Sequence, residues 1–268
     1  VAYKLAHLLH GRAEAPVGTP ETLFGDDAEN DAFIYTLYAD AVAGRVPERT
    51  VLDVVEAAGA YPDQVDSIRE ALASIVHEPA IRRIIIHLDQ QRSPEEFEPF
   101  LPEVVPIHNH LQTAIILVLD GTLPIEVVRV VAQELLDRYQ FGPERLERLA
   151  SDFLASRRRF AHVIDLPAFA RSLRAVDPAR PPPGDPDEDE VRVGSVEATA
   201  RLLARMADVA EEVAPAPSEV EAAAPAGRDY VALWAAEVAR AEELRRQRKE
   251  AAAGKGTRPD GVREALED

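Results

Sequence analysis

Residues 33–51 read FIYTLYADAVAGRVPERTV, and 77 positions further along the chain residues 110–128 read HLQTAIILVLDGTLPIEVV. Aligned without a gap, residues 33–77 and 110–154 have nine identities in 45 positions, and several other pairs exchange one apolar residue for another. A sequence that recurs at a fixed spacing is typical of stacked helical units. We therefore interpret the echo as a duplication.

A glycine followed three residues later by a proline stands at the same place in both copies, at Gly44–Pro47 and at Gly121–Pro124. Glycine readily ends a helix because it adopts positive φ, and proline is tolerated in the first turn of the next one. Each copy therefore predicts a helix, a corner, a second helix and then a third. One such unit is too small to bury its apolar faces alone, so we expect the two to pack together.

Apolar residues spaced three and four apart predict helices over most of the chain up to Val176. The stretch Ile84–Ile86 is β-branched and could form a strand, but no turn residue interrupts residues 80–91. We expect a helix there and a loop over residues 12–30. The predicted fold class is all-α.

Composition changes after Val176, where proline and uncompensated acidic residues indicate an extended linker. A second segment rich in proline and alanine follows an amphipathic helix. The predicted organisation is a helical core domain at 1–176 with possible repeats at 31–91 and 108–166, an acidic linker at 177–190, a helix at 191–213, a Pro/Ala linker at 214–227, and a docking helix with its tail at 228–268.

The chain has 268 residues with 48 acidic and 30 basic side chains, giving a formal net charge of −18. Such a charge opposes binding to nucleic acid and to anionic membranes, and it favours basic partners. The absence of cysteine excludes disulfides, thiolate metal sites and cysteine nucleophiles. No signal-peptide pattern opens the chain and no apolar run reaches the length of a bilayer span, so we expect a cytoplasmic protein without a membrane partner.

No phosphate-binding loop, dinucleotide fingerprint, serine elbow or zinc-protease motif occurs in the sequence, and we expect no cofactor. His108 and His110 could share a metal on a strand, where residues i and i+2 point the same way. They stand at the start of a predicted helix, where the two side chains diverge. A composite metal site remains an alternative, with His87, His108 and His110 as its candidate ligands beside Asp89 and Asp120.

The last predicted helix is aromatic and apolar at its start and basic further on, which is typical of a docking helix anchored by its aromatic residues and steered by its arginines. A solvated helix stabilised by Glu–Arg pairs is the alternative. The candidate partner-binding residues are Tyr230, Leu233, Trp234, Arg240, Arg245, Arg246 and Arg248.

Tethered amphipathic helices and missing catalytic signatures together predict a non-enzymatic interaction component: an adaptor, an assembly factor or a structural subunit. It would engage a protein partner or a second copy of itself through its C-terminal helices. Two alternatives stay open, a metal-dependent enzyme with a histidine and carboxylate site, and an acidic regulator that imitates nucleic acid.

Overall fold

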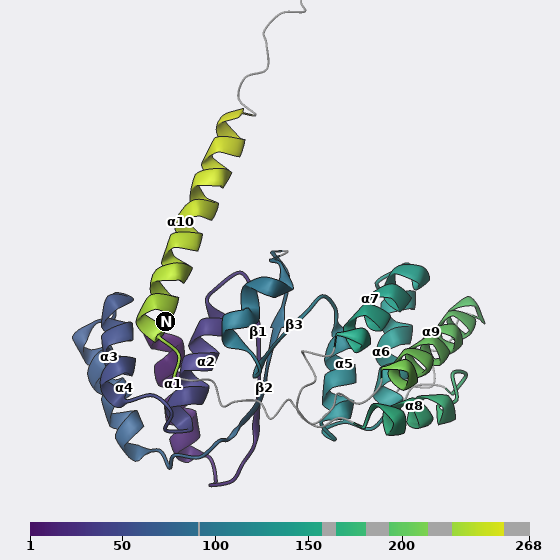
Figure 1. The fold of residues 1–268 in the computed structure, drawn as a ribbon, viewed down its shortest axis with the longest axis horizontal. Coiled ribbons are helices and arrows are strands. Elements are labelled where there is room, and N and C mark those ends of the chain that lie inside the picture. The colour runs from purple at the N-terminus through teal and green to yellow at the C-terminus, as the bar shows by residue number, and fades with distance from the viewer. Residues whose placement is uncertain (91, 157–164, 181–192, 214–226, 255–268) are drawn as a thin grey trace, which may run out of the picture. The chain divides into compact units, whose positions relative to one another are not determined.

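The computed structural model describes residues 1–90, 92–156, 165–180, 193–213 and 227–254. Most of the 177–190 and 214–227 linkers, and the tail after residue 254, lie outside these residues. The described part is helix-rich and contains a small parallel sheet (Figure 1). The chain divides into two compact units: unit 1 is Val1–Glu14, Asp40–His77 and Gly227–Asp268, and unit 2 is Ala15–Ala39 and Glu78–Ala226.

The sheet is the main correction to the predicted all-α fold. It has the strand order β1-β2-β3 with both pairs parallel, and its strands are β1 (Glu21–Asp26), β2 (Ile81–His87) and β3 (Val104–Ile107). The predicted helix over residues 80–91 is therefore wrong. Ile84, Ile85 and Ile86 are all buried, and a parallel strand covered on both faces is expected to be continuously apolar rather than alternating.

Unit 2 builds its core between this sheet and a group of helices. The helical elements of this unit that follow β2 are η1 (Pro94–Phe100), α5 (His110–Leu119), α6 (Glu126–Asp137), α7 (Pro143–Ala155), α8 (Leu166–Ala175) and α9 (Val193–Glu212). Register places Ile85 opposite Val105, and both join the buried apolar cluster of α5 to α9. Helix α9, predicted to be tethered, packs on α6, α7 and α8.

Unit 1 is a separate, smaller group of helices drawn from distant parts of the sequence. It contains α1 (Ala2–Glu14), α3 (Glu48–Ala57), α4 (Pro62–Ser74) and α10 (Tyr230–Gly254). Helix α4 packs on α1 and on α3, and α10 packs on α3. The division between the units falls inside α2 (Asp31–Val42), after Ala39.

The two echoing stretches have the same order of elements. Helices α2, α3 and α4 occupy the first, α5, α6 and α7 occupy the second, and each copy follows a strand of the sheet. Both corner glycines have positive φ, 69° at Gly44 and 70° at Gly121. The predicted helices and corners are present, and duplication as their origin stays a prediction.

Candidate functional site

The three parallel strands end side by side, so the residues that follow them share one edge of the sheet. Register pairs Asp26 with His87, and His87 with Ile107. The Asp27 N–H donates to the carbonyl of His87 (3.1 Å), and the Leu88 N–H donates to the carbonyl of Ile107 (2.8 Å). We call the ends of β1, β2 and β3, with the residues up to Asp31, Asp89 and His110, the carboxyl edge.

At the end of β1, a glycine lets an acidic side chain lie against the strand. A Cβ atom at Gly25 would come within 2.5 Å of Asp31 Oδ2, so only glycine fits. The same oxygen accepts the Asp26 N–H at 3.3 Å. Asp31 stands in the first turn of α2, where the positive end of the helix dipole favours a carboxylate.

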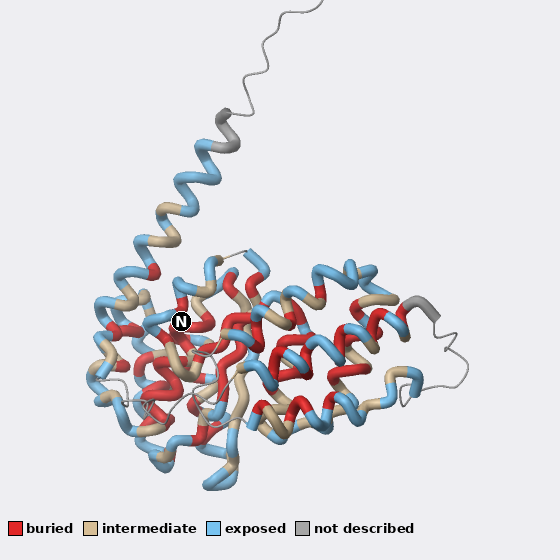
Figure 2. Tube along the Cα trace, turned by 45° about the vertical axis from the view of Figure 1, so that its right-hand side comes forward, coloured by how far each residue is buried: buried red, intermediate tan, exposed pale blue. Residues whose placement is uncertain are grey.

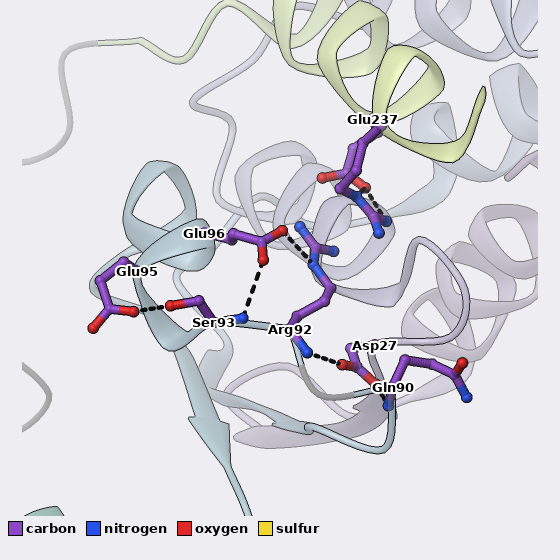
Figure 3. Close-up of polar contacts among 8 residues, drawn as sticks. Asp27, Gln90, Arg92, Ser93, Glu95, Glu96 and Glu237 are labelled. Atoms are coloured by element: carbon purple, nitrogen blue, oxygen red, sulfur yellow. Dashed lines mark hydrogen bonds and ion pairs between the residues drawn. The ribbon is translucent and has the colours of Figure 1, made fainter. Parts of the chain in front are cut away.

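The buried carboxylate of Asp27, the residue directly after β1, holds the loop that follows β2 (Figure 3). Asp27 is buried, and its carboxylate accepts the N–H of Gln90 at 2.7 Å and that of Arg92 at 3.0 Å. The Arg92 guanidinium in turn donates to Glu96 at 3.1 Å. Asp27 is therefore occupied as a structural clamp, whereas Asp26 uses one oxygen to accept the Ala28 N–H at 2.9 Å.

Two of the three histidines predicted as metal candidates meet at this edge. The rings of His87 and His110 stack with centroids 5.5 Å apart and an interplanar angle of 15°. His87 is half-buried and His110 is exposed. His108 is exposed, and its backbone N–H donates to Gln112 Oε1 at 2.6 Å. Among the described residues, no three His, Asp or Glu side chains are arranged to hold a metal ion by themselves.

An unsatisfied donor lies beside these histidines. Asn109 caps α5, its Oδ1 accepting the Gln112 N–H at 3.2 Å. Its Nδ2 is buried and has no hydrogen-bond acceptor within the described residues. Buried polar groups nearly always have a partner, so this amide is an exception among the described residues.

In unit 1, the start of α10 is anchored by a buried polar cluster. Asp40 accepts Arg45 Nε at 2.6 Å, Arg228 Nη1 at 2.9 Å and the hydroxyl of Tyr230. Tyr230 is 1% exposed. Burial, and then the nearby Asp40 carboxylate, raise the pKa of the Tyr230 phenol above its ordinary value. Tyr230, predicted to bind a partner, thus fastens α10 to its own unit.

The remaining candidates on α10 lie beyond this anchor, where most residues are exposed (Figure 2). Leu233 and Trp234 are half-buried. Arg240 pairs with Glu237 at 2.8 Å and Arg246 with Glu243 at 2.6 Å, which fits the solvated alternative for those two arginines. Arg245 and Arg248 are exposed.

The sequence did not indicate Asp26, Asp27, Asp31 or Asn109 as site residues. The available signal was the run Gly25-Asp26-Asp27 directly after an apolar stretch, but it lay inside a segment predicted to be a loop. Acidic residues are so numerous in this chain that their spacing alone carried no information. The sheet supplies what was missing, because it shows that these residues lie at or just after the ends of β1 and β3.

No family model, curated protein or solved structure matches this chain. Within the described part of the chain, no helix combines the length and the apolar character that crossing a bilayer requires.

Proposed function

We propose that this chain carries the ligand-binding edge of a metal-dependent enzyme, with the carboxyl edge of the sheet as its site. Ligands of open α/β sheets bind outside the carboxyl ends of the parallel strands. The observation that carries the proposal is the alignment of Asp26 with His87, next to β3 and its His108–His110 segment. A fold with helices alone would have no such edge.

The side chains favour a hard divalent cation such as Mg²⁺. Carboxylate oxygens are its preferred protein ligands, and Mg²⁺ is commonly bound by one or two carboxylates while water and substrate oxygens complete its octahedron. The lack of a three-ligand group among the described residues fits this mode and argues against a closed zinc site. Asp26 is the first candidate ligand. In this proposal the stacked His87–His110 pair and the Asn109 amide are the candidate contacts for an oxyanion on the substrate.

Titration of Mg²⁺ into the full chain by isothermal calorimetry tests the proposal. Asp26→Asn keeps the size of the side chain and its bond to the Ala28 N–H, and we expect it to weaken Mg²⁺ binding about tenfold or more. Asp152→Asn, an exposed acid on α7, removes the same charge elsewhere and should leave the affinity unchanged. Equal affinities of the two variants, or no saturable binding by the unaltered chain, contradict the proposal.

A protein-interaction component acting through α10 is the second candidate, favoured by the exposure of Val231, Val238 and Arg245 on one side of that helix. Most helical stability in proteins comes from packing of one face, and these turns expose theirs to solvent. Sedimentation of the full chain in low and high salt tests self-association. We expect Val238→Glu to abolish any association, whereas Gln247→Glu, an exposed change of similar charge, should not.

A further inference from the structure

A buried arginine in unit 2 belongs neither to the carboxyl edge nor to α10. Arg129 lies on α6 and is 1% exposed. Its Nη1 donates to Gln133 Oε1 at 2.5 Å. Its Nε is buried and has no hydrogen-bond acceptor within the described residues. An arginine keeps its charge in a protein, so this is a buried cation whose hydrogen bonds are incomplete.

The segment after α8 lies against this arginine. Gln133 Nε2 donates to the carbonyl of Pro178 at 2.9 Å, which ties the segment to α6. Asp177 Oδ1 accepts the Ala179 N–H at 2.9 Å, so its carboxylate already closes a local turn. Arg180 follows and is exposed.

The groups around Arg129 carry charges of both signs. Burial, and then the nearby guanidinium of Arg180, lower the pKa of Arg129. Asp177 and Glu126 act in the opposite direction, but the net shift is downward. Two guanidinium groups near one another favour an anion between them, because each gains an acceptor and their mutual repulsion is screened.

We propose that Arg129 and Arg180 bind a small oxyanion of the phosphate class between α6 and the segment that follows α8. The planar guanidinium of Arg129 offers its Nε–H to one oxygen from inside the unit. Arg180 contacts the anion from the solvent side, and the segment 177–180 closes over it. Gln133 connects α6 with the segment 177–180, because it accepts a hydrogen bond from Arg129 and donates one to the carbonyl of Pro178.

The second copy alone carries this arrangement. Arg129 aligns with Leu52 of the first copy, and Gln133 aligns with Glu56, which is exposed. The second stretch thus has a buried polar pair where the aligned residues of the first stretch need no buried partner. Replacement of a buried charge by an apolar side chain is often neutral or stabilising, so keeping an arginine here fits a ligand-binding role.

Thermal unfolding and calorimetric titration of the full chain with inorganic phosphate test this site, at constant ionic strength and without Mg²⁺. We expect a saturable rise of the unfolding temperature in phosphate relative to chloride, as binding to the folded state requires. Arg180→Gln should weaken phosphate binding about tenfold. Arg171→Gln, an exposed arginine on α8, makes the same change and should bind like the unaltered chain.

Arg129→Met supplies an independent reading. We expect this variant to fold, and its unfolding temperature should no longer depend on phosphate. If this variant does not fold, the comparison of Arg180→Gln with Arg171→Gln still tests the proposal. Equal phosphate affinity of those two variants, or no phosphate dependence in the unaltered chain, overturns the proposal and leaves water as the partner of Arg129. Asp26→Asn should retain phosphate binding in the absence of Mg²⁺, which separates this site from the carboxyl edge.

Discussion

The first echoing stretch, residues 33–77, and the second, residues 110–154, form the same elements and use them differently. Each enters from a strand of the parallel sheet, turns at a glycine with positive φ and continues through two more helices. The second stretch lies wholly in unit 2. The first is divided, since α2 begins in unit 2 whereas α3 and α4 belong to unit 1.

Individual aligned positions show why the two stretches diverge. Asp40 in the first copy anchors α10 through Arg228 and Tyr230, whereas its counterpart Leu117 packs against the apolar cluster of unit 2. The local signals that end and restart helices are shared, while the residues that choose a packing partner are not. Different residues of the sequence therefore determine where a helix ends and which element it packs against.

The largest predicted difference is at the end of the third helix. Phe153 is 2% exposed in the core of unit 2, and its counterpart Val76 is 55% exposed. We expect Phe153→Ala to lower the free energy of unfolding by about 3–5 kcal/mol through loss of burial and the cavity left behind. Val76→Ala should change it by less than about 0.5 kcal/mol. Chemical denaturation measures both, and similar losses would mean that the copies pack alike.

The Asp40 anchor should produce a loss that depends on pH. Tyr230→Phe removes a buried hydrogen bond to a charged acceptor and should lower the free energy of unfolding by about 1.5–3 kcal/mol at neutral pH. The pKa of Tyr230 is raised in the folded state above its ordinary value of 10.0. Above that pH the unfolded chain therefore loses the phenol proton while the folded chain keeps it, and stability falls as pH rises.

Denaturant unfolding at pH values between about 8 and 11 measures this slope. Tyr230→Phe should flatten the decline relative to the unaltered chain. Tyr61→Phe is the control, because Tyr61 is 72% exposed, and it should leave the slope in place. An equal slope in the Tyr230 and Tyr61 variants would show that the anchor does not control the phenol.

The smallest predicted effect concerns the corner glycines, which the two stretches share. Gly44→Ala and Gly121→Ala both place a Cβ on a residue with positive φ, which should cost about 1–2 kcal/mol each. A Cβ at Gly44 would meet the His77 side chain at 3.4 Å, whereas none lies within 4 Å at Gly121. A separation of 3.4 Å is an ordinary van der Waals contact, so thermal unfolding should show similar losses at the two corners. A loss at only one corner would separate the two copies even at their most similar position.

Local signals in the sequence were enough for the helices of the two echoing stretches and their corner glycines, because caps and breakers act within a few residues. The sheet was missed because its strands are short and the apolar run of β2 covers only Ile84–Ile86. Periodicity alone cannot separate so short an apolar run from part of a buried helix. The carboxyl edge was missed with it: Asp26 and His87 are 61 positions apart, and only strand pairing brings them together. Arg129 gives no local signal, because a buried arginine and an exposed one look alike in sequence.

The bond from Tyr230 to Asp40 spans 190 positions of the chain, and this has a consequence for synthesis. Unit 1 is assembled from three stretches, the last of which starts at Gly227. As the chain leaves the ribosome, α3 and the Asp40 carboxylate stay uncovered by α10 until residues 228–230 have been made. Contacts between such distant residues form late and slowly. Until then the Asp40 carboxylate lacks two of its hydrogen-bond donors, Arg228 and Tyr230.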